Sequence, residues 1–182
     1  MVKQARSRIA AVITGRSRPS GPGGFSLLEV IIVVVILAIA AAMVVPMISS
    51  GAGTKVMAAA QMVAADLEYA KSMAVTRGRR YRVTFDAVGE SYQVEDPNGV
   101  VIAHPVNLGF NYVFDFDGSR LDGVQIVSAD FDGTNQVQFD SLGSPHNGGG
   151  GPLNSGVITL QAGSLTQTIR VEPVTGVITI HD

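Results

Sequence analysis

Glu29 is the only charged residue in an apolar run that covers residues 25–45, where Ser26 is the only other polar residue. A carboxylate inside hydrocarbon costs roughly 2.5 to 3.5 kcal/mol, so a chain usually keeps one there for a cationic partner. The alternative is that Glu29, only four residues into the run, lies near the membrane surface and reaches water there. The residues alone leave both explanations open.

Two copies of the tetrapeptide Asp-Phe-Asp-Gly bring together residues that a hard cation such as calcium prefers. The full calcium loop, D-x-D-x-D-G with a distal glutamate, is missing, and Asp-Gly pairs also form turns without an ion. We therefore expect turns and no metal site. The candidate calcium ligands are Asp115, Asp117, Asp130 and Asp132.

Catalytic patterns are scarce in the sequence. The three histidines, His104, His146 and His181, lack HExxH spacing, no G-x-S-x-G is present, and there is no cysteine to act as a nucleophile or thiolate ligand. The glycine run at residues 148–151 lacks the Gly-Lys-Ser/Thr of a phosphate loop, which favours a flexible surface loop. The sequence predicts no enzyme and no cofactor, although a triad assembled from distant residues would leave a membrane-anchored enzyme as the rival.

Charge is divided unevenly along the chain. Residues 1–24 carry five Lys and Arg and no acid, whereas the remainder carries eight basic and fifteen acidic residues. Lys and Arg next to an apolar span favour the cytoplasmic side of a membrane. Residues 1–24 are therefore expected in the cytoplasm, and the C-terminal part of the chain on the other side of the membrane. The net negative remainder also disfavours nucleic acid as a partner, despite the basic cluster formed by Arg77, Arg79, Arg80 and Arg82.

The elements around these residues follow from periodicity. Residues 25–45 are long enough to span about 30 Å as a helix. Pro46 is expected to bend the helix, and residues 49–53 to break it or let it flex. From about Thr54 the helix resumes, and Arg77-Gly78 ends it with a C-cap glycine. One face of this second part is apolar and is expected to pack on the domain's own sheet: Val56, Ala60, Val63, Leu67, Ala70 and Ala74.

Short strands and turns fill the rest of the chain. Alternating polar and apolar residues, as in residues 166–171, predict half-buried antiparallel strands. The fold class is therefore α+β, a long N-terminal helix packed on an antiparallel sheet. The expected strands cover residues 81–85, 91–95, 100–103, 124–127, 136–139, 157–160, 165–171 and 177–180.

The N-terminal sequence GGFSLLEV, which follows a basic leader and opens the apolar run, resembles the signal of type IV pilins and pseudopilins. This resemblance implies that a prepilin peptidase cuts between Gly24 and Phe25 and methylates the new amine of Phe25. It also implies that the cationic amine of one Phe25 neutralises Glu29 of a neighbour in a filament. The expected segments are a cleaved leader (1–24), a transmembrane helix and filament core (25–45), a helical continuation (46–77) and an extracytoplasmic β-rich domain (78–182).

The C-terminal half resembles the GspH/FimT group in four stretches: VQFDSLGSP at 137–145, GVITL at 156–160, TIRV at 168–171 and TGVI at 175–178. The resemblance implies a type IV pilin-like fold and a minor pseudopilin of a type II secretion system, assembled at or near the tip of a periplasmic pseudopilus. The alternative that it implies is a minor pilin of a type IV pilus, which primes assembly or contributes to DNA uptake.

The same resemblance implies partners and a location. The expected partners are other major and minor (pseudo)pilins, the prepilin peptidase/methyltransferase, the inner-membrane assembly platform, membrane lipid and a secreted cargo. The expected location is the bacterial inner membrane, as a single-pass protein with its N-terminus in the cytoplasm and its C-terminal domain in the periplasm, before incorporation into a pseudopilus or pilus.

Overall fold

The computed structural model describes residues 25–182, with side chains described for all of these except residues 41–50. The chain separates into two compact units with the division after Ala42, and each unit is described by itself. Within residues 25–40 and 51–182, no helix is both long and apolar enough to cross a bilayer. Gly24 and the rest of the leader, the end of the predicted span at residues 41–45, and Pro46 with its predicted bend lie outside this description.

Helix α1 covers Leu27–Arg77. In the second unit, all six residues of the predicted apolar face are buried, together with Ala59. This confirms that the face packs on the domain's own sheets. The helix ends as expected: Gly78 has a φ of 62°, and the N–H of Arg79 donates to the carbonyl oxygen of Ala74. Glycine takes that left-handed conformation without the steric cost of a Cβ atom.

The expected break at residues 49–53 is wrong for the part that is described, because Gly51, Ala52 and Gly53 are helical. A Cβ atom at Gly53 would lie 3.1 Å from Cδ1 of Leu165, which belongs to the facing sheet. The small residue therefore allows α1 and the sheet to approach closely. Packing against the sheet compensates for the low helix propensity of glycine.

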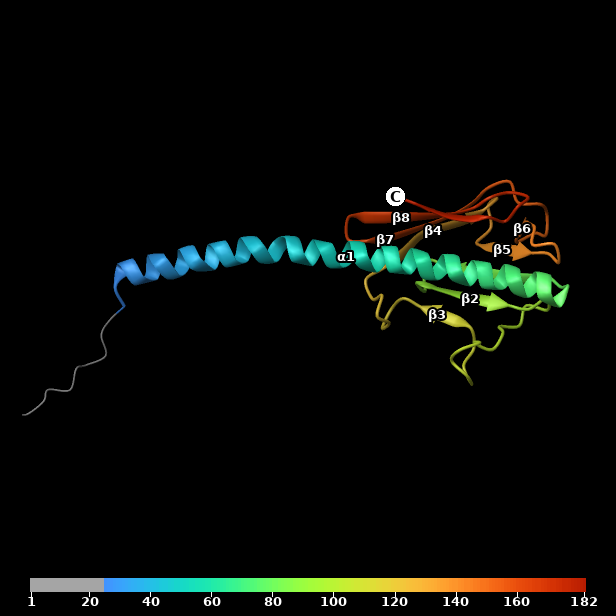
Figure 1. The fold of residues 1–182 in the computed structure, drawn as a ribbon, viewed down its shortest axis with the longest axis horizontal. Coiled ribbons are helices and arrows are strands. Elements are labelled where there is room, and N and C mark those ends of the chain that lie inside the picture. The colour runs from blue at the N-terminus through green and yellow to red at the C-terminus, as the bar shows by residue number, and fades with distance from the viewer. Residues whose placement is uncertain (1–24) are drawn as a thin grey trace, which may run out of the picture. The chain divides into compact units, whose positions relative to one another are not determined.

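The strands form two antiparallel sheets. The first has five strands in the order β3 (Val113–Asp115), β2 (Ser91–Glu95), β1 (Tyr81–Asp86), β5 (Gln136–Phe139) and β6 (Pro145–Asn147). The second has four, in the order β4 (Gln125–Phe131), β7 (Gly156–Ala162), β8 (Leu165–Val171) and β9 (Ile178–His181). In Figure 1 the later part of α1 runs alongside the strands of both sheets.

Most predicted strands are confirmed, including the alternation in β8, where Gln167, Ile169 and Val171 are buried. The strand expected at residues 100–103 is wrong, because Val101 and Ala103 form only isolated bridges. Two strands of three residues each, β3 and β6, were not expected from the sequence. Both lie at sheet edges, where a short strand or one that begins with proline can be accommodated.

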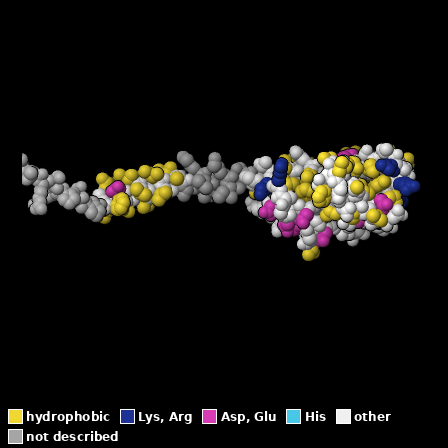
Figure 2. Space-filling model, turned by 90° about the horizontal axis from the view of Figure 1, so that it is seen from below, with side chains coloured by type: hydrophobic (Ala, Val, Ile, Leu, Met, Phe, Trp, Pro, Cys, Tyr) yellow, Lys and Arg dark blue, Asp and Glu magenta, His cyan; other side chains and the backbone are white. Residues whose placement is uncertain are grey.

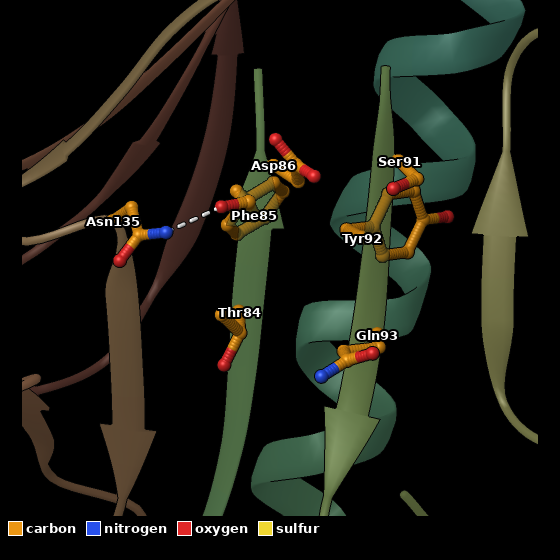
Figure 3. A pocket seen from close by; sticks show the side chains of 7 residues that line it. All are labelled: Thr84, Phe85, Asp86, Ser91, Tyr92, Gln93 and Asn135. Carbon is orange, nitrogen blue, oxygen red and sulfur yellow. Dashed lines mark hydrogen bonds between the residues drawn. The ribbon is translucent and has the colours of Figure 1, made fainter. Parts of the chain in front are cut away.

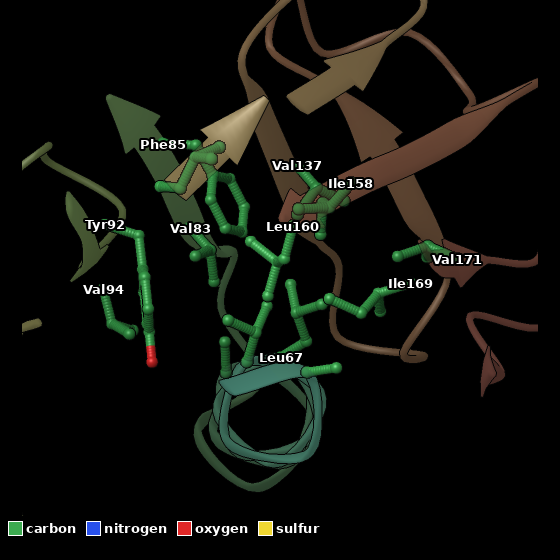
Figure 4. Close-up of a cluster of buried hydrophobic side chains, with 14 of the residues drawn as sticks. Leu67, Val83, Phe85, Tyr92, Val94, Val137, Ile158, Leu160, Ile169 and Val171 are labelled. Carbon is green, nitrogen blue, oxygen red and sulfur yellow. The ribbon is translucent and has the colours of Figure 1, made fainter. Parts of the chain in front are cut away.

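The hydrophobic core lies between α1 and the two sheets. Leu67 projects from the helix toward side chains of both sheets, as Figure 4 shows. Burying one such side chain contributes roughly 1.5 to 3 kcal/mol. The largest fully buried side chains of the sheets include Phe85, Tyr92, Phe131, Phe139, Ile158, Leu160 and Ile169. The second unit thus has a core of its own, as an independently folding domain requires.

Candidate functional site

The two described residues of the predicted processing and assembly site are Phe25, just before α1, and Glu29, in the first turn of α1. The carbonyl oxygen of Ser26 accepts the N–H groups of Glu29 (3.0 Å) and Val30 (3.2 Å), which sets the first turn. Phe25 and Glu29 both line a shallow hollow of about 200 Å³, together with valines of the next two turns. The side chain of Phe25 is 83% exposed, and Glu29 is exposed as well.

The electrostatics of this first turn favour a carboxylate. The N-terminal N–H groups of a helix have no partners within it, and the helix dipole is positive at that end. In the part of the chain that the structure describes, the two ion pairs are Lys71–Glu68 and Arg82–Glu95. Glu29 therefore has no cationic partner among these residues.

The helix around Glu29 is apolar on all sides. Every large apolar side chain from Leu27 to Ile39 is at least 49% exposed. Figure 2 shows these side chains around a single acidic one. A helix that is hydrophobic all round needs cover from lipid or from other protein. This segment can thus anchor the chain or pack among similar helices.

The four aspartates of the two DFDG stretches form turns. Asp115 accepts the N–H of Asp117, and Asp130 accepts the N–H of Gly133. Asp132 accepts the N–H groups of Asn154 and Ser155, and these hydrogen bonds lower the pKa of its carboxyl. In residues 25–40 and 51–182, no three His, Asp or Glu side chains lie close enough together to share a metal ion.

A cluster around Asp66 was not expected from the sequence. Asp66, on α1, accepts hydrogen bonds from the hydroxyls of Tyr92 (2.6 Å) and Tyr112 (2.9 Å). The ring of Tyr112 stacks against those of Tyr69 and His104, with centroids 5.4 Å and 4.6 Å away. The apolar stripe had placed Asp66 away from the buried face, and nothing local in the sequence marks tyrosines 26 and 46 residues away as its partners.

The protonation of this cluster follows from its burial. Burial raises the pKa of Asp66, and the two tyrosine hydrogen bonds act in the opposite direction. Burial and the neighbouring carboxylate raise the pKa of Tyr92 and Tyr112 above the usual 10.0. Both hydroxyls therefore stay protonated at neutral pH and donate to Asp66. The cluster acts as a clamp between α1, β2 and the chain before β3.

A hollow of about 310 Å³ opens beside the turn between β1 and β2. Figure 3 shows its lining residues, with the Nδ2 of Asn135 donating to the carbonyl oxygen of Phe85 at 2.6 Å. Asp86, its only carboxylate, accepts the N–H groups of Val88 and Gly89 through one oxygen. The polar groups of the hollow thus serve the turn and its neighbouring strands.

The remaining candidate residues are distributed over separate elements. His104 lies in the loop before β3, His146 in β6 and His181 in β9. Arg77, Arg79 and Arg80 are exposed at the end of α1. Arg82 instead lies in β1, where it donates to the carbonyl oxygen of Pro97 and pairs with Glu95. The glycine run at 148–151 is a hydrogen-bonded turn, in which Gly151 donates to Asn147 and Gly148 to Thr134.

Comparison with protein families gave two matches. Residues 59–175 match the family of the type II transport protein GspH. Residues 21–45 match the prokaryotic N-terminal methylation motif. A comparison with curated protein sequences found no match.

Two solved structures illustrate the fold that this chain resembles. The minor pseudopilin EpsH from the type 2 secretion system of Vibrio cholerae has a TM-score of 0.52 at 12% identity, over 70% of this chain and 96% of that one. The type IV minor pilin FimU of Pseudomonas aeruginosa has a TM-score of 0.47 at 16% identity, over 71% and 90%. The likeness to EpsH confirms the predicted pilin-like α+β fold.

Proposed function

The chain belongs to the GspH family, and on this premise we propose that it is a minor pseudopilin of a type II secretion system. As such it assembles into a periplasmic pseudopilus, at or near its tip, and supports protein export. One observation carries the proposal: the methylation motif at residues 21–45 and the GspH match at residues 59–175 occur in the same chain and in this order. The family is structural, so the proposed role is assembly rather than catalysis.

The first proposed step is processing. Prepilin peptidase hydrolyses the peptide bond between Gly24 and Phe25 on the cytoplasmic side, and the new amine of Phe25 is methylated. The exposure of Phe25 at the start of α1 supports access to this residue. Methylation of an amine leaves it basic, so the mature terminus still carries a positive charge.

The second proposed step is incorporation into the filament. The cationic amine of Phe25 in one subunit lies beside Glu29 of its neighbour and neutralises it, which removes the cost of a lone carboxylate in hydrocarbon. Glu29 is exposed and has no ion-pair partner within the described chain, which leaves it available for this contact. The surrounding apolar side chains then pack in the filament core.

The partners and the location follow from these steps. Before assembly, the apolar helix anchors the chain in the inner membrane, with the basic leader in the cytoplasm and the β-rich domain in the periplasm. The proposed partners are the prepilin peptidase, the inner-membrane assembly platform, other major and minor pseudopilins, and a secreted cargo. Membrane lipid surrounds the helix until the subunit is extracted.

The test of this function is removal of the gene from cells that have both a type II secretion system and type IV pili. We expect export of the secreted enzymes to fail, pili to persist, and the wild-type chain to restore export. Loss of pili with intact export would contradict the proposal and identify a minor pilin instead. If neither is affected, both filament functions fail and a membrane-anchored enzyme or binding domain becomes the better explanation.

A further inference from the structure

Residues 104–110 lie in the connection between β2 and β3 and carry three exposed apolar side chains. Val106, Leu108 and Phe110 are 84%, 82% and 64% exposed. In Figure 1 this connection extends outward from the domain. Single exposed apolar residues are common on proteins, but several together present a surface that can bind another molecule. The contacts that fix this segment therefore decide how the surface is presented.

The base of the segment is fixed by backbone hydrogen bonds. The N–H of His104 donates to the carbonyl oxygen of Phe110 at 2.8 Å, and Ala103 and Asn111 form an isolated bridge just outside this pair. Backbone amides do not change their protonation near neutral pH. We therefore expect the base of the segment to persist when the pH changes.

The inner part of the segment depends on a single side chain. The Nδ1 of His104 accepts the N–H groups of Val106 at 3.2 Å and of Asn107 at 3.0 Å. Because a ring nitrogen accepts a hydrogen bond only when it carries no proton, this arrangement requires a neutral ring with its proton on Nε2. Two backbone hydrogen bonds thus end on a nitrogen that can itself be protonated.

Other turns of the same domain are closed in this way by aspartate. One carboxylate oxygen of Asp86 accepts the N–H groups two and three residues further along the chain, both at 3.0 Å. Asp96 and Asp140 each accept the N–H groups two and four residues further along. An exposed carboxylate stays an acceptor between about pH 5 and 8, whereas histidine changes its charge in that range. The turn at His104 is therefore expected to respond to pH where the aspartate turns do not.

The surroundings of the His104 ring can accommodate a positive charge. The ring stacks on Tyr112 with centroids 4.6 Å apart, and Tyr112 stacks on Tyr69 of α1. The carboxylate of Asp66, which Tyr92 and Tyr112 hold by hydrogen bonds, interacts electrostatically with His104. Tyrosine is uncharged below about pH 10, so the carboxylate is the charged group that faces the ring. A protonated ring can thus stay in its stack.

We propose that protonation of His104 switches residues 105–109 from a fixed to a mobile state. A proton on Nδ1 removes the acceptor that Val106 and Asn107 share and places a third N–H group against theirs. The base of the segment stays paired, so the change is local and reversible. Acidification thus turns a fixed apolar surface into a mobile segment. The inference goes beyond the proposed function and does not rest on it.

A spin label on the segment tests this switch, because the chain has no cysteine of its own. Leu108→Cys in the full-length chain is labelled with a nitroxide in detergent, and its electron paramagnetic resonance spectrum is recorded from about pH 8 to about pH 5. We expect the mobility of the label to rise reversibly by at least about twofold over this range, in which histidine takes up its proton. The matched control is a label at Val88→Cys, 96% exposed in the turn that Asp86 closes, and its mobility should not change.

Two histidine variants of the labelled chain assign the response to one ring. His104→Asn supplies an amide oxygen that can accept the same two N–H groups and does not titrate, so the label should stay restrained at both ends of the pH range. His146→Asn changes a histidine in β6, outside this segment. That variant should respond to pH as the unchanged chain does.

Three outcomes would overturn the proposal. Equal mobility of the Leu108→Cys label at both ends of the pH range would show that His104 does not control the segment. A response that persists in His104→Asn would assign it to another group, such as Asp66. An equal response of the label at Val88→Cys would show a general loosening of the domain rather than a local switch.

Discussion

Two carboxylates on the same helix have opposite surroundings. Glu29 is exposed in an apolar segment without an ion-pair partner among the described residues, whereas both oxygens of Asp66 accept hydrogen bonds from tyrosines within the domain. Glu29 is thus available to a group from another chain, and Asp66 is not. We propose the assembly role for Glu29, whereas the two tyrosine hydrogen bonds give Asp66 a structural role.

The role of Glu29 predicts a specific assembly defect. Glu29→Gln keeps the shape of the side chain and removes its charge, so we expect incorporation into filaments to fall at least tenfold while membrane insertion is unchanged. The amount of this chain in sheared filaments measures incorporation, and its amount in membrane fractions measures insertion. The exposed Asp117 provides a control in the β-rich domain, and Asp117→Asn should leave both unchanged. Normal incorporation of Glu29→Gln would contradict the charge pairing.

The hydrogen bonds of Asp66 predict that its replacement destabilises the folded chain. Asp66→Ala leaves the hydroxyls of Tyr92 and Tyr112 without their acceptor, and a buried donor without a partner costs about 1 to 3 kcal/mol. We expect the free energy of unfolding to fall by about that amount in urea denaturation. The double variant with Tyr92→Phe should lose less than the sum of the two single changes. Additive losses would contradict a direct interaction.

The same cluster predicts a loss of stability at alkaline pH. The pKa of Tyr92 and of Tyr112 is raised above the usual 10.0, so the folded chain binds these protons more tightly than the unfolded chain. Their contribution to stability is complete below about pH 10 and is lost as the pH rises toward the folded-state pKa. Absorbance at about 295 nm should show these two tyrosines ionising only with unfolding. Their ionisation near pH 10 in the folded chain would contradict the clamp.

Single residues were predictable from the sequence where their local context is unusual. Glu29 interrupts an apolar run, and Gly78 follows the last apolar turn of the helix, so both can be found by inspection. Asp66 has ordinary neighbours, and its role depends on Tyr92 and Tyr112, which only the folded chain brings to it.

Among the elements, the turn between β8 and β9 shows how close packing fixes a conformation. Gly176 has a φ of 60°, and a Cβ atom there would lie 2.6 Å from the carbonyl oxygen of Gly143. The carbonyl oxygen of Gly176 accepts a hydrogen bond from Lys71 at 2.9 Å. The turn is therefore held against α1 and against the turn between β5 and β6.

Two substitutions in this turn should act in opposite directions. Gly176→Ala introduces a backbone clash and a disfavoured φ, so we expect it to lower the free energy of unfolding by at least about 2 kcal/mol. Val174 has a φ of 65°. Val174→Gly removes the strain of a β-branched residue in that conformation and should raise the free energy of unfolding by up to about 1 kcal/mol. Thermal or urea denaturation of the two variants measures these changes in the free energy of unfolding. A stabilising Gly176→Ala would contradict the close approach.

The sequence predicted the elements whose period is regular. The stripe from Val56 to Ala74 and the alternation in β8 mark their buried faces, and the bounds of β2, β5 and β8 were predicted correctly. β3 and β6 are too short to show a period. Gly53 is helical, and it lies close to Leu165 of the facing sheet, an approach between distant segments that local propensity cannot reveal.

At the scale of the whole molecule, two parts have different tasks. The apolar start of α1 has no core of its own and needs lipid or neighbouring subunits around it, whereas the second unit buries a stripe of α1 against two sheets. The family matches cover both parts, with the methylation motif over the first and GspH over most of the second. The proposed function therefore depends on whether the cell processes this chain as it processes pilins.

The most direct test of this processing is intact mass and N-terminal sequencing of the chain. The chain is recovered from membranes of cells with and without prepilin peptidase. We expect a chain that begins with methylated Phe25 when the peptidase is present, and an uncut chain when it is absent. Gly24→Ala would provide a matched variant in which cleavage falls although the helix is unchanged. A chain that keeps its leader, or is cut elsewhere, in the presence of the peptidase would contradict the account.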